Sequence, residues 1–254
     1  TLVPYTLPSP TYIVFQFDEG KDVPYVVRKA IAMCVNREEI STKVFAGIQP
    51  PEYNFYPSAM GWSSNSDAPA PSYDLAGARA LLEGAGYKKD ANGYYVAGLI
   101  LDCFGQASTD AAKLISAACK EAGIELVINS LEYQAWGTKV STNQDFVVGM
   151  LGGFQGPDVA ALAGRISTEG TMNHGDYSNA RIDELFEEGL KSTDLEVRKP
   201  YYHEIQKIMS EELPIIPIVG YQAYTGQASY VTDTPYQCAG RAGWAEFLYT
   251  DIVK

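Results

Sequence analysis

Residues 177–217 read YSNARIDELFEEGLKSTDLEVRKPYYHEIQKIMSEELPIIP, and they predict two amphipathic helices followed by an extended segment. Ser178 or Asn179 can accept the free amide hydrogens at the start of the first helix, and Asp194 can accept those of the second. In both helices the apolar residues recur at helical spacing: Ile182, Leu185, Phe186, Leu190, Ile205, Ile208 and Met209. The closing ELPIIP favours an extended chain, because proline cannot donate the backbone hydrogen bond that a helix needs.

The residues before this stretch alternate between predicted strands and predicted helices. Runs of β-branched and aromatic residues predict strands at 12–17, 94–104, 124–131 and 145–151. Capping residues and helical spacing predict helices at 24–35, 36–47, 74–85, 108–122 and 133–141. This alternation is typical of α/β folds with right-handed crossovers. We therefore predict a mixed sheet flanked by helices.

Three features interrupt that regular pattern. Pro200 lies inside the second helix of the opening stretch and predicts a kink or break near Lys199. Residues 49–70 form a loop that is too long to be a simple connector. From residue 219 onward Tyr, Gly and Thr dominate, and they suggest short strands or loops that close the domain.

The composition indicates a folded, acidic protein. The 254 residues are 46% hydrophobic and 20% charged, which is ordinary for a globular chain. The net charge of -12 disfavours binding to nucleic acid or to anionic membranes, because those partners carry the same sign. No stretch approaches the roughly 20 consecutive apolar residues that a membrane-spanning helix needs.

The four cysteines, Cys34, Cys103, Cys119 and Cys238, show no CxxC spacing. Zinc-knuckle and thioredoxin-like functions are therefore disfavoured. Cys34 and Cys119 lie on apolar faces of predicted helices, so they could be core thiols or the two partners of a disulfide. The apolar surroundings favour core thiols.

Four segments, in order along the chain, resemble the peptide- and nickel-type solute-binding proteins of ABC importers. They are VVRKAIAMCVNREEI at 26–40, YDLAGARALLEGAGY at 73–87, AGIELVINSLEY at 122–133, and the helical stretch at 177–217. The resemblance spans roughly residues 12–217, which is most of the chain. The resemblance implies a periplasmic-binding-protein-like type II lobe with an α/β fold.

In that family, two lobes close over a ligand in a hinge motion and then dock on a membrane permease. The resemblance implies that residues 1–254 form a single domain, the second of the two lobes. We expect an initial strand at 1–17, a lobe core at 18–218 and a closing segment at 219–254. The expected partners are a small solute, the missing first lobe and an ABC permease. The expected location is periplasmic or extracellular, as a lipoprotein or a free periplasmic protein.

The loop GGFQGPD at 152–158 follows a predicted buried strand and is the main candidate for ligand contact. Ligands of α/β sheets favour the carboxyl ends of strands. In peptide binders of the family, an acidic residue of the corresponding loop holds the ligand's amino group. Here the candidates are Gly153, Phe154, Gln155 and Asp158, of which Asp158 alone matches an acidic position. Asp158 could equally cap a helix at 159–163.

Phe104, Tyr133 and Trp136 follow the ends of predicted strands and could line the cleft, although core packing is the alternative for each. Asn173, in a Gly/Asn-rich turn, is a further candidate. An oligopeptide is the expected ligand, and oligosaccharides or metal chelates are the alternatives within the family.

An enzyme is disfavoured because few reactive groups can converge. His174 and His203 are the only histidines, and no GxSxG, HExxH, P-loop or dinucleotide motif accompanies them. We expect no catalytic residue, metal or cofactor. An α/β hydrolase remains the alternative, and it would need one of these histidines beside a nucleophile. A receptor-like or chaperone module is a third possibility.

Overall fold

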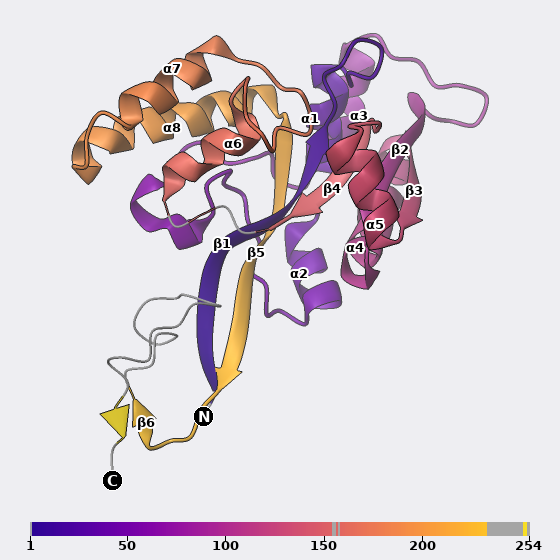
Figure 1. The fold of residues 1–254 in the computed structure, drawn as a ribbon. Helices are drawn as coiled ribbons and strands as arrows, with labels where there is room; N and C mark the ends of the chain where they lie inside the picture. The colour runs from indigo at the N-terminus through magenta and orange to yellow at the C-terminus, as the bar shows by residue number, and fades with distance from the viewer. Residues whose placement is uncertain (1, 154–155, 157, 233–250, 253–254) are drawn as a thin grey trace.

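A five-stranded mixed sheet organises the protein, whose computed structural model describes residues 2–153, 156, 158–232 and 251–252 (Figure 1). The strand order is β3-β2-β4-β1-β5. The strands β2, β3 and β4 run parallel, and β1 is antiparallel to both of its neighbours. Their bounds are Leu2–Phe15 for β1, Val96–Phe104 for β2, Ile124–Leu131 for β3, Val148–Gly152 for β4 and Ile215–Gly226 for β5. A separate short pair joins β6 (Val231–Thr232) to β7 (Asp251–Ile252).

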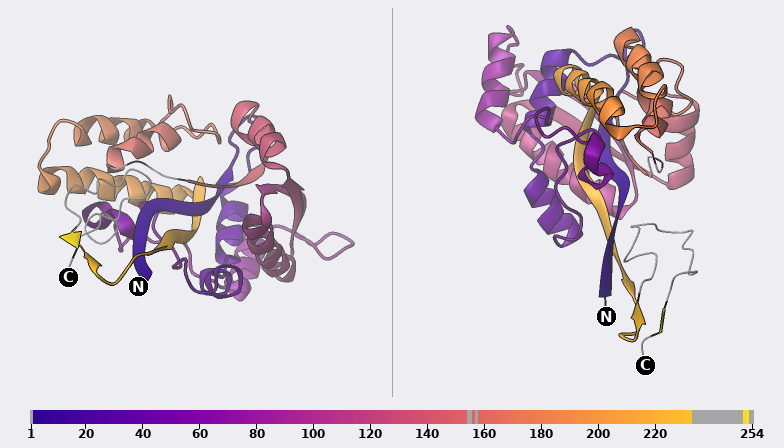
Figure 2. Two further views of the ribbon diagram at one scale, coloured as in Figure 1. Left: turned by 60° about the horizontal axis from the view of Figure 1, so that its bottom comes forward. Right: turned by 90° about the vertical axis from the view of Figure 1, so that its left-hand side faces the viewer.

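Helices cover both faces of this sheet (Figure 2). The first group is α1 (Tyr25–Met33), α2 (Arg37–Phe45), α3 (Leu75–Gly84) and α4 (Gln106–Ala122). The second is α6 (Ala163–Ile166), α7 (Ala180–Gly189) and α8 (Leu195–Glu212). The remaining helical segments are η1 (Ser58–Ser63), α5 (Tyr133–Trp136), the π-helix η2 (Gly137–Thr142) and η3 (Val159–Leu162). None of the helices in the described residues has the length and apolar composition needed to cross a membrane.

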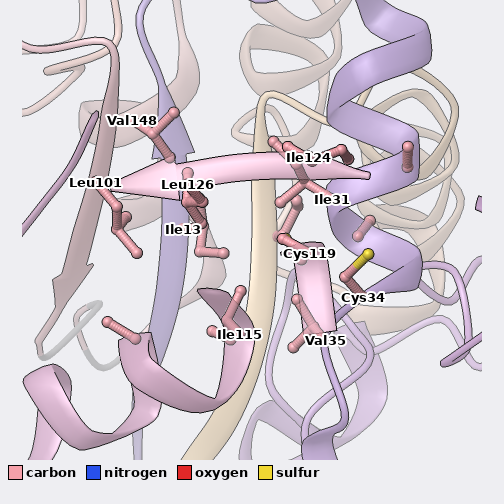
Figure 3. Packing of buried hydrophobic residues seen from close by; sticks show 14 of the residues in the cluster. Ile13, Ile31, Cys34, Val35, Leu101, Ile115, Cys119, Ile124, Leu126 and Val148 are labelled. Atoms are coloured by element: carbon pink, nitrogen blue, oxygen red, sulfur yellow. The ribbon is translucent and has the colours of Figure 1, made fainter. Parts of the chain in front are cut away.

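The side chains of β1 point alternately to the two faces of the sheet, and each face has its own hydrophobic core. Ile13 and Phe15 point into the core shared with the first helix group, and Tyr12 and Val14 point into the core shared with the second. Successive strand side chains face opposite sides of a sheet, so a continuous apolar run fits a strand with both faces covered. Figure 3 shows the first core, where β1, β2 and β3 meet α1 and α4.

The helix caps predicted from the sequence are confirmed. Asn36, Asp74, Asn179 and Asp194 each accept a backbone amide hydrogen in the first turn of α2, α3, α7 and α8. Of the kink or break predicted near Lys199, the break is wrong, because α8 continues through Pro200. Pro200 lies early in the helix and removes a single ladder hydrogen bond, which the packing of the later turns compensates.

A two-stranded ribbon leaves the sheet beside the end of β4. Thr11 pairs with Gly152, and from Leu2 to Leu7 the described partner of β1 is β5 alone. The ribbon projects away from the helices, with the first residues of the chain at its tip (Figure 1). The prediction of short strands or loops from residue 219 onward is wrong up to Gly226, because β5 runs unbroken to that residue. Beyond it, β6 and β7 are short strands of two residues each, as predicted.

Candidate functional site

The carboxyl ends of three parallel strands lie at one edge of the sheet. Phe104, the last residue of β2, pairs with Leu131 at the end of β3, and Gly152 ends the neighbouring strand β4. Ligands of α/β sheets bind most often at such an edge, where loops with free polar groups follow the strands. The sequence candidates Phe104, Tyr133, Gly153 and Asp158 all follow or end these strands.

The structure brings the three candidate aromatic residues into one cluster. The ring of Phe104 lies 4.4 Å from that of Trp136 and 5.2 Å from that of Tyr133, and the rings of Tyr133 and Trp136 stack at 6.4 Å. Tyr133 is 67% exposed, whereas Trp136 is buried and its indole Nε1 has no hydrogen-bond partner among the described residues. Trp136 therefore supports the cluster from beneath, and Tyr133 offers an open aromatic face.

Gly153 begins the candidate loop with a backbone that disfavours other residues. Its φ is +133°, a conformation that L side chains rarely adopt. A Cβ at this position would lie 3.8 Å from the Arg165 guanidinium, whose Nη1 donates a hydrogen bond to the Tyr12 hydroxyl. Sequence analysis did not identify Arg165, which brings a positive charge beside the loop. The candidates Phe154 and Gln155 lie outside the described residues.

Asp158 caps η3, as one of the two interpretations of the sequence predicted, and it also forms an ion pair. Its carboxylate accepts a hydrogen bond from the amide of Ala160 and two from Arg198, at 2.6 and 2.9 Å. The Arg198 guanidinium lowers the pKa of Asp158 below its ordinary value. Arg198 lies forty positions away in α8, so local sequence spacing gave no indication of this pair.

Arg198 also fixes the long loop before α3. Its guanidinium lies 5.4 Å from the Trp62 ring and 5.2 Å from the Tyr202 ring, and it donates to the Tyr202 hydroxyl. Nearby, Gln206 donates to the Ser63 carbonyl, which ties the same loop to α8. The loop of residues 49–70 is thus anchored beside Asp158.

Asn173 uses its side chain within its own turn. The amide nitrogen donates to the carbonyls of Ser167 and Tyr177, and the amide oxygen accepts from the Tyr177 backbone. The residue is 6% exposed, so its polar atoms contribute to the fold of the turn.

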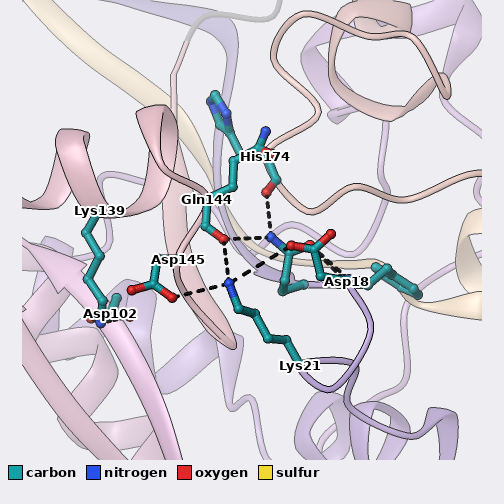
Figure 4. A network of polar contacts seen from close by, with 9 residues as sticks. Asp18, Lys21, Asp102, Lys139, Gln144, Asp145 and His174 are labelled. Atoms are coloured by element: carbon teal, nitrogen blue, oxygen red, sulfur yellow. Dashed lines mark hydrogen bonds and ion pairs between the residues drawn. The ribbon is translucent and has the colours of Figure 1, made fainter.

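A polar network occupies the opposite edge of the sheet, where β1 ends and β4 begins (Figure 4). The buried amide of Gln16 donates to the carbonyls of Gln144 and His174. Lys21 lies 3.2 Å from the Asp145 carboxylate and donates to the same Gln144 carbonyl. These bonds link the segment that follows β1 to the segment that precedes β4 and to the turn at His174. The network therefore stabilises the fold.

Deeper in the same region, the Asp102 carboxylate is fully buried on β2. Lys139 from η2 donates to both of its oxygens at 2.8 Å, and Asn129 from β3 donates to one of them. A buried charge is tolerated only when it is paired in this way. The π-helical turn of η2 thereby becomes fixed to the sheet.

Replacing Asp176 with asparagine should flatten the dependence of stability on pH. The hydrogen bond with Asp18 raises the pKa of Asp176 above its ordinary value of 3.8. The folded state then binds that proton more tightly than the unfolded state, so stability is greatest below the ordinary pKa and falls as the pH rises through the raised pKa. Asparagine tolerates the residue's φ of +52°. Urea unfolding at about pH 4 and about pH 7 measures the slope. Asp18→Asn should flatten it equally, and an undiminished slope in both variants would contradict the assignment.

The contacts of the two histidines differ within the described part of the chain. His203 Nε2 lies 3.4 Å from the Trp62 carbonyl oxygen, and burial lowers the pKa of His174. Within the described residues, neither imidazole is hydrogen-bonded to a serine, threonine or cysteine side chain. In that part of the chain, no group of His, Cys, Asp and Glu side chains is arranged to hold a metal ion.

Comparison with known proteins places this arrangement in a family. Residues 5–172 match the sequence profile of "Bacterial extracellular solute-binding proteins, family 5 Middle". Protein XP55 of Streptomyces lividans is 27% identical over 72% of this chain and 35% of its own length. The peptide transport periplasmic protein SapA of Salmonella typhimurium is 23% identical over 96% of this chain and 45% of its own length. The chain thus spans less than half the length of these relatives.

The fold agrees with the sequence match. The murein tripeptide binding protein MppA of Escherichia coli superposes with a TM-score of 0.78 at 18% identity, covering 100% of this chain and 50% of MppA. At that identity the likeness shows the fold alone, and it confirms the predicted type II lobe with a mixed sheet flanked by helices. The profile match covers more than half of the chain and describes binding proteins rather than enzymes. The chain therefore belongs to family 5 of the bacterial extracellular solute-binding proteins.

Proposed function

We propose that this chain is one lobe of a solute-capture protein of an ABC importer, and that it forms one wall of a cleft for a small peptide. The observation that carries the proposal is the position of the β1–β5 ribbon. The ribbon leaves the sheet at the edge where β4 ends, beside Gly152 and the candidate loop. A second lobe attached through this ribbon would face that edge, and a ligand between the lobes would contact it.

The β1–β5 ribbon also has the features of a hinge. Two antiparallel strands that pair mainly with each other can bend or twist without disturbing the two hydrophobic cores. Hinges in domain closure are short segments of this kind, which absorb the change in backbone angles while the packed bodies move rigidly. A closed form with a distinct shape would then be available for docking on a membrane permease.

A peptide suits the described chemistry of this edge. Tyr133 offers an aromatic face for an apolar side chain, and the glycines around residue 153 let a ligand approach the backbone closely. The relatives SapA and MppA carry peptide in their names, which supports the same ligand class. The protein would act outside the cytoplasm, free in the periplasm or held at the cell surface as a lipoprotein.

Isothermal calorimetry with a mixture of oligopeptides tests the proposal. The lobe alone should show no binding tighter than about 1 μM, because it supplies half of the contacts while the full entropy cost of association remains. The full-length protein should bind components of the same mixture more tightly. Tight binding by the lobe alone would refute the two-wall cleft. Absence of binding by the full-length protein would refute the peptide assignment.

A further inference from the structure

Two cysteines that are distant in the sequence meet in the first hydrophobic core. Cys34 follows the last turn of α1, and Cys119 lies in the last turn of α4. Both are 0% exposed. Both are free thiols in the structure. The nearby Cys34 thiol, together with burial, raises the pKa of Cys119. Figure 3 shows the two residues as neighbours.

Both cysteines belong to the first hydrophobic core, among apolar side chains of the described residues. Ile31, Val35, Ile115 and Ile124 enclose it, and all four side chains are at most 1% exposed (Figure 3). Neither sulfur can reach a solute or a metal from this position. Two neighbouring cysteines in such surroundings can pack as small apolar residues or form a bond with each other.

We propose that Cys34 and Cys119 form a disulfide when the protein folds outside the cytoplasm. The inference rests on the extracytoplasmic location in the proposed function, because such compartments are oxidising. The bond would join α1 directly to α4 and close a loop from residue 34 to residue 119. Cross-linking residues so far apart restricts the unfolded chain strongly and thereby stabilises the folded lobe.

The oxidant would be the disulfide of a dithiol–disulfide oxidoreductase. The thiolate of one cysteine attacks this disulfide, forms a mixed disulfide and releases the first oxidoreductase thiol. The thiolate of the second cysteine then attacks the protein sulfur of the mixed disulfide. The products are the Cys34–Cys119 bond and a reduced oxidoreductase, whose two thiols take up the two protons.

Burial determines when this exchange can occur. In the folded lobe no oxidoreductase can reach either sulfur, and the raised pKa of Cys119 keeps its thiol protonated and unreactive. The bond must therefore form before α1 and α4 pack together. Folded, reduced protein should resist oxidation, and the same protein should form the bond during refolding with a disulfide oxidant.

Peptide mapping of the full-length protein, exported into a bacterial periplasm, tests the proposal directly. The protein is denatured without reductant, its free thiols are alkylated with iodoacetamide, and its proteolytic peptides are analysed by mass spectrometry. We expect the peptide that contains Cys34 to be linked to the peptide that contains Cys119, with Cys103 alkylated. In a second arm, oxidised glutathione is added to reduced protein before or during refolding, and the link should form during refolding only.

Variants separate the disulfide from general effects of reduction. Dithiothreitol should increase the ratio of unfolded to folded protein by at least about tenfold in the wild type and in Cys103→Ser. It should have no effect in the double variant Cys34→Ser/Cys119→Ser. Alkylation of both cysteines in the non-reduced sample, or a link from either to Cys103 or Cys238, would overturn the proposal. Peptide binding measured on the same samples tests the proposed function separately, because the two sulfurs lie far inside the core.

Discussion

Replacing Arg37 with methionine should lower the free energy of unfolding by about 3–5 kcal/mol. The Arg37 side chain is completely buried, and its Nε donates to the carbonyls of Glu52 and Pro217 at 2.9 Å. Its Nη1 donates to the carbonyl of Pro71 at 3.0 Å. Methionine fills a similar volume but donates nothing, so these buried carbonyl oxygens would lose their partner.

The expected loss is large because Arg37 joins three separate segments. It connects the start of α2 to the loop of residues 49–70 and to β5, and its guanidinium lies 4.6 Å from the Tyr53 ring. Burial lowers the pKa of Arg37 to about 10, so the side chain remains charged at neutral pH and its hydrogen bonds stay charge-assisted.

Urea unfolding followed by circular dichroism measures the effect, and Arg181→Met is the matched control. Arg181 forms ion pairs with Glu184 and Glu204, but all three side chains are well exposed. Exposed ion pairs contribute little to stability, so the control should unfold close to the wild-type midpoint. Equal, small losses in the two variants would show that the buried bonds of Arg37 do not support the fold as described.

Local sequence patterns predicted most of the helices, the strands β2, β3 and β4, and the last residues of β1. Asn36, Asp74, Asn179 and Asp194 marked helix starts correctly because a cap is made within three residues of the chain. The strand predicted at 124–131 has the bounds of β3, since a glycine precedes it and Leu126, Val127 and Ile128 form an apolar run within it. The residues within and next to these elements are therefore sufficient to predict them.

The resemblance implied an initial strand at 1–17, and β1 occupies Leu2–Phe15, but its pairing with β5 was not predicted because it depends on a distant partner. The first nine residues of β1 contain Pro4, Pro8 and Pro10, which argue against a strand when they are considered alone. Within the described residues, positions 2–7 of β1 pair with β5 alone, and strands paired on one side tolerate proline. The register shifts between Leu7 and Tyr12 accommodate the proline-rich segment.

The position of the candidate site was predicted from the strand ends. The ion pair between Asp158 and Arg198 was not predicted. The α/β pattern predicted that the site lies after β2, β3 and β4. The helix predicted directly after Asp158 indicated that this residue is a cap. The pairing of Asp158 with Arg198 depends on how α8 packs over η3. No local periodicity encodes a contact between positions forty residues apart.

Replacing Arg198 with methionine should lower the free energy of unfolding by about 2–4 kcal/mol. The variant loses the hydrogen bonds to the Gly189 carbonyl and the buried Tyr202 hydroxyl, as well as both bonds to Asp158. The Trp62 ring also loses the guanidinium on which it lies. Thermal unfolding of the wild type and the variant provides the comparison, and an unchanged midpoint would contradict the anchoring role.

A double-mutant cycle with Asp158→Asn separates the two possible roles of the carboxylate. Asparagine keeps an oxygen that can cap η3 but removes the charge, so the cycle isolates the ion pair, with an expected coupling of about 0.5–3 kcal/mol. If Asp158 serves only the fold, the full-length protein carrying Asp158→Asn should bind its peptide with unchanged affinity. If the exposed part of the carboxylate also receives a ligand's amino group, affinity should fall by about tenfold or more, because a charged hydrogen bond is lost. Because Arg198 already satisfies both carboxylate oxygens, we expect the first result.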